Sequence, residues 1–110
     1  MTSRGSPLLQ GTLDLIVLQL LRDHPTNGYE LAQRIQTISR DVLSVNAGSL
    51  YPALYRLLQR RWIRSEWQVT ENARRARYYA LTPAGRAQLA RERVQWDKLS
   101  RGVNLILAES

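Results

Sequence analysis

The sequence predicts an α+β fold in which three helices, a two-stranded β-hairpin and a long final helix follow one another along the chain. Apolar residues recur with the 3.6-residue period of an amphipathic helix in four segments, and residues 62–81 alternate as two strands do. With 110 residues, the chain is long enough for one hydrophobic core and too short for two. We therefore expect an N-terminal arm over residues 1–7, one domain over residues 8–82 and a C-terminal helix over residues 83–110.

The first two helices are predicted over residues 8–22 and 28–39. The first carries two apolar stripes on nearly opposite faces, so we expect it to lie between two partners. One stripe would cover the core of the domain, and the other, which includes Leu15, would meet another subunit or the final helix. The second helix begins after Asn27, with Glu30 three residues later, as in a capping box.

The third helix is predicted to begin at Gly48 or Ser49 and to end at about residue 61. Pro52 has no backbone N–H, so we expect it in the first turn, where that donor is not needed. Leucines occupy the inward arc of the helix. The outward arc carries hydrogen-bonding and cationic side chains, namely Ser49, Tyr55, Arg56, Gln59 and Arg60, with Tyr51 at its edge. Such a face can approach a groove closely and bind phosphates.

Two strands are predicted over residues 62–70 and 74–81, joined by a short polar turn. In the first strand apolar residues, Trp67 among them, alternate with polar ones, so the strand is expected to be half-buried. Three arginines lie near the tip of this hairpin: Arg74, Arg75 and Arg77. They are either the solvated face of an ordinary hairpin or contacts to a polyanion, and alternation puts the last two on one face.

The final helix is predicted to begin after Thr82 and to end at about residue 108. Apolar residues recur along it with a spacing close to a heptad: Leu89, Trp96, Leu99, Val103 and Ile106. Because a helix rises about 1.5 Å per residue, this one extends past so small a domain, and its own chain leaves the stripe uncovered. We therefore expect a homodimer whose interface contains these residues and Leu15. Trp96 is either an ordinary packing residue there or, with its symmetry mate, a binding site for a flat aromatic effector.

The chain is strongly basic, and almost all of its positive charge is arginine. Sixteen Lys and Arg residues against nine Asp and Glu give a net charge of +7, and only Lys98 is a lysine. Residues 56–77 carry five of the seven net charges. Arginine is favoured for bidentate contacts to phosphates and base edges, so a polyanionic partner is the first hypothesis.

Several classes of protein are disfavoured by what the sequence lacks. It has no cysteine for a disulfide or a thiolate metal site, and its single histidine, His24, is expected to be an exposed loop residue. Uninterrupted apolar stretches, such as residues 15–18, fall far below the roughly 20 residues of a membrane-spanning helix. We therefore expect a cytoplasmic protein that is not an enzyme and that uses no metal and no cofactor.

Three helices followed by a β-hairpin is the order of a winged helix-turn-helix. In that arrangement the third helix enters the major groove of double-stranded DNA, and the hairpin, called the wing, reaches adjacent phosphates or the minor groove. Base selection would then depend on Ser49, Tyr55, Arg56 and Gln59, and Arg56→Ala is expected to relax it.

Two tyrosines have alternative roles in this arrangement. Tyr51 either lies at the edge of the core or hydrogen-bonds a phosphate. Tyr29 either meets a phosphate beside a helix N-terminus or packs under the third helix. Two other classes of function also fit the sequence, a protein–protein interaction module and an RNA-binding domain, although the latter should present aromatic residues on an open face.

Four segments of the chain resemble signature segments of PadR-like transcriptional regulators, in the same order and spacing. They are Gly28-Tyr29-Glu30-Leu31, Gly48-Ser49-Leu50-Tyr51-Pro52-Ala53-Leu54, residues 74–79 and Leu81-Thr82-Pro83-Ala84-Gly85. The resemblance covers residues 8–107. It implies a dimeric bacterial regulator, usually a repressor, that binds an inverted-repeat operator. With its single C-terminal helix, the chain is similar to the short subfamily, which lacks a larger effector domain.

Overall fold

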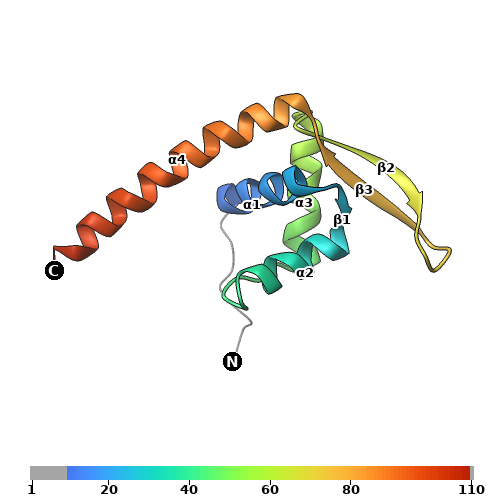
Figure 1. Ribbon diagram of the computed structural model, residues 1–110, viewed down its shortest axis with the longest axis horizontal. Helices are drawn as coiled ribbons and strands as arrows, with labels where there is room; N and C mark the ends of the chain where they lie inside the picture. Colours follow the sequence, from blue (N-terminus) through green and yellow to red (C-terminus); the bar gives the residue numbers. More distant parts are fainter. Residues whose placement is uncertain (1–9, 110) are drawn as a thin grey trace.

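The computed structural model describes residues 10–109, so the arm expected over residues 1–7 lies outside the described residues. Four helices and three strands follow one another (Figure 1): α1 Gln10–Asp23, β1 Thr26–Asn27, α2 Gly28–Ile38, α3 Ala47–Gln59, β2 Ile63–Val69, β3 Arg75–Leu81 and α4 Pro83–Ala108. The predicted α+β winged helix-turn-helix with a long C-terminal helix is therefore confirmed. None of the described helices is both long enough and apolar enough to span a bilayer.

The core is built around α1. Five of its residues are buried: Leu13, Val17, Leu18, Leu20 and Leu21. They pack with the inward leucines of α3 and with the bases of β2 and β3. Because buried residues occupy more than one side of α1, the helix is enclosed as predicted, with α4 above it and α2 below it in Figure 1 and with α3 crossing beside it. Leu15 is partly buried at the edge of this core.

The sheet has one strand more than the predicted hairpin. β1, which lies between the first two predicted helices, pairs with β3 through Thr26 opposite Tyr79 and Asn27 opposite Tyr78. Thr26 is completely buried, and its hydroxyl donates a hydrogen bond to the carboxylate of Glu30. A strand of two residues is too short to show an alternating pattern, so only the folded chain defines it.

Helix α3 begins earlier than predicted. The side chain of Asn46 caps it by accepting a hydrogen bond of 2.9 Å from the backbone N–H of Ser49. Since the helix starts at Ala47, Pro52 lies in the second turn, and its predicted position in the first turn is wrong. The proline ring lies on the exposed face, where it does not interrupt the core packing.

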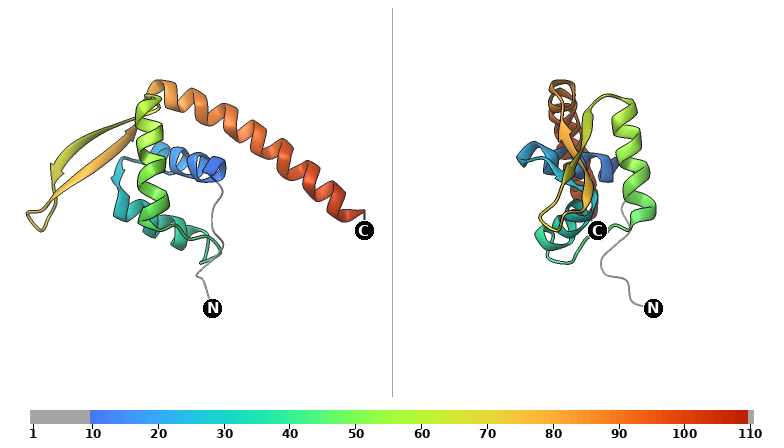
Figure 2. Two further views of the ribbon diagram at one scale, coloured as in Figure 1. Left: turned by 180° about the vertical axis from the view of Figure 1, so that it is seen from behind. Right: turned by 90° about the vertical axis from the view of Figure 1, so that its right-hand side faces the viewer.

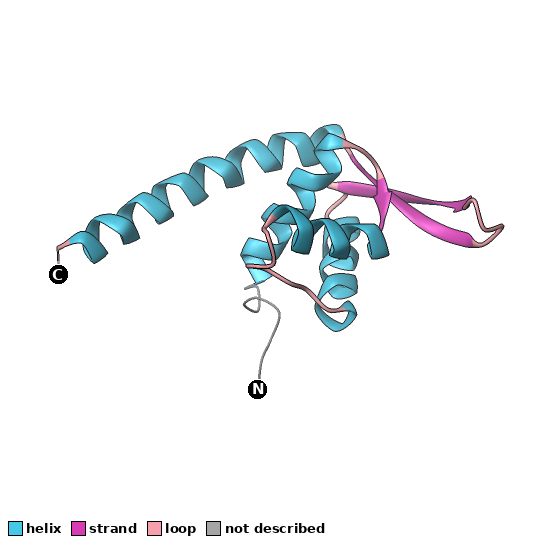
Figure 3. Cartoon of the chain, turned by 60° about the horizontal axis from the view of Figure 1, so that its bottom comes forward, coloured by secondary structure: helices cyan, strands magenta, loops and turns pink. Residues whose placement is uncertain are grey.

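The wing projects from the helical body (Figures 2 and 3). Only its base is buried, at Ile63, Tyr79 and Leu81. The prediction that β2 is half-buried along its length is wrong, because Trp67 and Val69 are exposed. Alternation identifies which side chains share a face of a strand, but it does not show how far the body extends beneath that face.

Helix α4 is fixed to the body only through its first turns. Thr82 caps it, and Leu89 is buried in the core of its own chain. The prediction that Leu89 belongs to a dimer interface is therefore wrong. Beyond this point the helix extends away from the body on the side opposite the wing (Figures 1 and 2), and its apolar residues are exposed.

Candidate nucleic-acid interface

The outward face of α3 carries most of the side chains that the sequence analysis placed there. Ser49, Tyr55 and Gln59 are exposed, and the amide of Gln59 donates a hydrogen bond of 3.1 Å to the phenol oxygen of Tyr55. Arg60 is also exposed, but its guanidinium stacks 5.1 Å from the ring centroid of Trp62. The face therefore offers hydrogen-bonding groups that project from a rigid helix.

Arg56 does not point away from the body, so this part of the prediction is wrong. Its guanidinium donates a hydrogen bond of 2.9 Å to the carboxylate of Asp14 in α1, and its side chain is 29% exposed. Its Nε atom is buried without a partner among the described residues. Arg56 therefore links α1 to α3. A helical wheel places Arg56 in the outward arc, and only the packed position of α1 supplies the acidic partner that turns it inward.

We expect Arg56→Ala to destabilise the fold instead of relaxing base selection. The substitution leaves the carboxylate of Asp14, 17% exposed, without its partner, which costs about 1–3 kcal/mol of the free energy of unfolding. A double-mutant cycle with Asp14→Ala, followed by thermal unfolding, isolates the interaction between the two side chains. Additive effects of the two substitutions would show that this ion pair contributes nothing.

A groove opens between the wing and the N-terminus of α2. Its volume is about 610 Å³, and it is lined mainly by tyrosine, tryptophan and arginine side chains: Tyr29, Tyr51, Trp67, Arg74, Arg75, Arg77 and Tyr79. None of the residues that line it is acidic. The groove thus combines three guanidinium groups with phenol hydroxyls, a composition suited to the sugar-phosphate backbone of a nucleic acid.

The two tyrosines expected near phosphates both open onto this groove. Tyr29 is 71% exposed, so the alternative in which it packs under α3 is wrong. Tyr51 lies against α2 so closely that a Cβ atom at Gly28 would be 2.6 Å from its hydroxyl oxygen. Glycine at this position therefore lets the Tyr51 ring sit over the first turn of α2. Burial raises the pKa of Tyr79, which lies beneath them and stays neutral at physiological pH.

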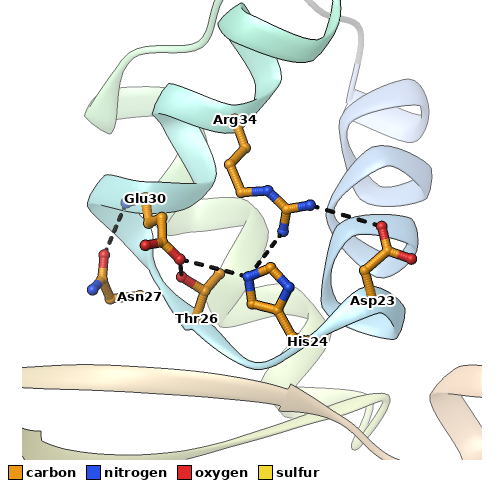
Figure 4. A network of polar contacts seen from close by, with 6 residues as sticks. All are labelled: Asp23, His24, Thr26, Asn27, Glu30 and Arg34. Carbon is orange, nitrogen blue, oxygen red and sulfur yellow. Dashed lines mark hydrogen bonds and ion pairs between the residues drawn. The ribbon is translucent and has the colours of Figure 1, made fainter.

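The N-terminus of α2 is held in place by a network of polar side chains (Figure 4). Its members are Asp23, His24, Thr26, Asn27, Glu30 and Arg34. The predicted cap is confirmed, because Asn27 accepts a hydrogen bond of 2.8 Å from the backbone N–H of Glu30. His24 is exposed as expected, and its Nε2 atom lies 3.3 Å from the guanidinium of Arg34 and 3.7 Å from the carboxylate of Glu30. These contacts fix the edge of the groove.

The arginines of the wing are held in two different ways. Arg75 stacks on Trp67, with its guanidinium carbon 5.0 Å from the ring centroid. Arg77 donates from Nε to the hydroxyl of Ser65 at 2.9 Å. Sequence reasoning missed Trp67 as a candidate functional residue, since the alternating pattern placed it inside. Only the structure shows that the helical body does not extend beneath Trp67, which leaves this ring exposed among arginines.

The predicted dimer stripe, apart from Leu89, is exposed along the distal part of α4. Its members are Trp96, Leu99, Val103 and Ile106. Leu15 and Trp96 also line an open apolar groove of about 350 Å³ between α1, α2 and α4, with Arg34 and Arg93 among the other residues around it. The described residues thus present a continuous apolar surface, and its role in a dimer remains a prediction.

Comparison with known proteins identifies the family. The model of the transcriptional regulator PadR-like family matches residues 17–91. The chain is 37% identical over 86 residues to transcriptional regulator Rv3488 of Mycobacterium tuberculosis, an alignment that covers 78% of this chain and 79% of that protein.

Solved structures agree in fold. A PadR family regulator from Eggerthella lenta superposes with a TM-score of 0.74 at 32% identity, over 89% of this chain and 83% of that one. A transcriptional regulator from Clostridium thermocellum superposes with a TM-score of 0.79 at 27% identity, over 86% of this chain and 92% of that one. The chain belongs to the PadR-like family of transcriptional regulators.

Proposed function

We propose that the protein represses transcription by binding an inverted-repeat operator as a homodimer. Helix α3 enters the major groove, and the wing with the first turn of α2 binds the flanking sugar-phosphate backbone. The observation that carries the proposal is the juxtaposition of two surfaces. The exposed face of α3 offers hydrogen-bonding side chains, and the adjacent groove contains three arginines and no acidic residue.

The two surfaces have different roles. Ser49, Tyr55 and Gln59 supply donors and acceptors for base edges, and they select the sequence. The arginines of the wing bind phosphates whatever the sequence, and Tyr29 and Tyr51 add hydroxyl donors beside the N-terminus of α2. Arg56 has no direct part in base selection, because its guanidinium is engaged by Asp14.

The homodimer forms through the distal half of α4. In an isolated chain Trp96, Leu99 and Val103 are exposed, and burying apolar surface of this kind is the main favourable term in association. A two-fold interface would present two copies of α3 to successive major grooves, about one helical turn of DNA apart.

Selection from a random pool of DNA duplexes tests the proposal. We expect a consensus with two-fold symmetry and half-sites separated by about one turn of the double helix. Titration against salt should give a slope of roughly −5 to −7 in log affinity against log salt concentration, because each half of the dimer neutralises three or four phosphates. A duplex of scrambled sequence serves as the control. Failure to enrich any duplex at low ionic strength would contradict the proposal.

RNA binding is the second candidate, and one observation favours it. Tyr29, Tyr55 and Trp67 are exposed on the cationic side of the molecule, and exposed aromatic rings can stack on unpaired bases. The predicted half-buried position of Trp67 disfavours RNA binding, whereas the structure exposes this ring. Competition between a selected duplex and a single-stranded RNA of equal length distinguishes the two functions. We expect the duplex to displace the RNA from the protein.

An aromatic effector fits the groove beside Trp96. Its walls are mainly apolar, and Arg93 supplies a positive charge beside it, while Arg34 is paired with Asp23. Charge complementarity therefore favours a planar aromatic anion over a planar cation. Titration of tryptophan fluorescence with matched anionic and cationic aromatic compounds tests this choice, and a response to the cation alone would contradict it.

A further inference from the structure

The outer half of the wing carries a large apolar side chain in water. Trp67 is 57% exposed, although an indole is among the most favourable side chains to bury. The guanidinium of Arg75 covers part of the ring, 5.0 Å from the centroid. The body of the domain does not extend beneath this part of the strand, so the exposed indole has no role in the core.

The two faces of the wing differ in charge. Trp67 lies opposite Arg77 and Val69 lies opposite Arg75, so these four side chains share one face. The acidic residue of β2, Glu66, lies on the other face, where its carboxylate is 3.9 Å from the guanidinium of Arg64. The face with the tryptophan therefore combines two arginines with apolar surface, and it continues into the groove beside Tyr29 and Tyr51.

Stacking leaves the binding groups of Arg75 available. A guanidinium that lies over a ring uses its flat face, while its N–H donors point outward in the plane of the group. A free arginine side chain loses much rotational freedom when it binds a phosphate, and a stacked one has lost part of that freedom already. Arg77 differs, because its Nε–H is committed to Ser65.

We propose that Trp67 is a positioning residue for DNA binding, which holds the guanidinium of Arg75 ready for a backbone phosphate. The inference rests on the proposed function and adds a residue to it. A phosphate contact involves no base edge, so Trp67 contributes to affinity for every duplex and not to selectivity. Without the arginine–phosphate interaction, binding should also depend less on salt.

Four variants test the inference, with binding to the selected and the scrambled duplex measured by fluorescence anisotropy. Trp67→Ala is expected to weaken both complexes by about three- to tenfold and to reduce the magnitude of the salt slope by about one for each phosphate that is no longer bound. Trp67→Tyr retains a ring face and should bind within about twofold of the wild type, whereas Trp67→Leu retains only apolar surface and should remain weak. Gln68→Ala, on the opposite face of the strand, is the matched control and should bind like the wild type.

Coupling to Arg75 separates a positioning role from an independent contact. In an Arg75→Ala background, Trp67→Ala should cause less than about a twofold further loss of affinity, because the group that it positions is already absent. Since Trp67 is exposed, all variants should unfold at the temperature of the wild type.

Several results would overturn the inference. They are unchanged binding by Trp67→Ala, equal binding by the tyrosine and leucine variants, additive losses of affinity with Arg75→Ala, or a loss confined to the selected duplex. If the wild-type protein binds no duplex at all, the proposed function itself fails, and this outcome is distinct from the others.

Discussion

Replacing Gly85 by alanine should lower the free energy of unfolding by about 3 kcal/mol or more, the largest effect that we expect from adding a single methyl group to this protein. A Cβ atom at this position would lie 1.9 Å from the backbone carbonyl oxygen of Trp62, which already accepts a hydrogen bond of 3.0 Å from the N–H of Thr82. Backbone cannot move aside as the end of a flexible side chain can. The N-terminal end of α4 would have to move away from the connection between α3 and β2.

The connection between α3 and β2 is also held to α4 by the hydroxyl of Thr82, which increases the free-energy cost of displacing the helix. The hydroxyl of Thr82 donates a hydrogen bond of 2.7 Å to the carbonyl of Arg61, and it accepts one of 3.0 Å from the N–H of Gly85. Arg61 itself has a left-handed backbone, with φ of 61°. Displacing α4 therefore disrupts the junction at which the helical body, the wing and α4 meet.

Thermal unfolding measures this effect, and the midpoint should fall by more than about 10 °C for a domain of this size. The matched control is Gly102→Ala in the same helix. Apart from the backbone of its own helix and its chain neighbours, nothing in the described chain lies within 4 Å of the added Cβ there, so higher helix propensity should stabilise the chain by up to about 1 kcal/mol. Equal midpoints for the Gly85 variant and the wild type would contradict the close packing described here.

Replacing Leu99 by glutamate should convert the proposed dimer into a folded monomer and abolish tight binding to the operator. Leu99 is 60% exposed in the single chain, so the core should remain intact, but a carboxylate in the centre of an apolar interface is costly to bury. Without the dimer the two half-sites are bound independently, and affinity for the full operator should fall by about 10²-fold or more. Sedimentation gives the mass, and anisotropy titration gives the affinity.

Lys98→Glu provides the control for charge. Lys98 is exposed beside Leu99, about 100° further round α4, and Lys98→Glu makes the net charge more negative than Leu99→Glu does. We expect the Lys98 variant to remain dimeric and to bind with a modest loss of affinity that salt screens. A Leu99 variant that is still a dimer would place the interface elsewhere.

The order of the elements and the path of the chain follow from local patterns in the sequence. Asn27 and Thr82 each cap a helix as predicted, because capping requires only a side-chain oxygen near an N–H three residues away. The alternation of apolar and polar residues likewise predicted strands β2 and β3. These features depend on interactions between near neighbours along the chain, so the residues that cause them stand close together in the sequence.

Other features depended on which elements pack together. The apolar spacing of α4 assigned Leu89 to a partner subunit, whereas the packing of the first turns of α4 on the body buries it within the chain. A helical wheel turned Arg56 outward, whereas Asp14, 42 residues away, turns it toward α1. Trp67 was placed inside, whereas the wing extends beyond the body and leaves it exposed.

The sequence by itself thus determined the family, the succession of helices and strands, and the concentration of arginine in α3 and the wing. Only the tertiary structure decided which side chains remain available to a partner. Periodicity relates a residue to the axis of its own helix or strand. Whether a side chain can reach a partner depends on which other segments pack against it. Those contacts are set by the packing of the whole domain.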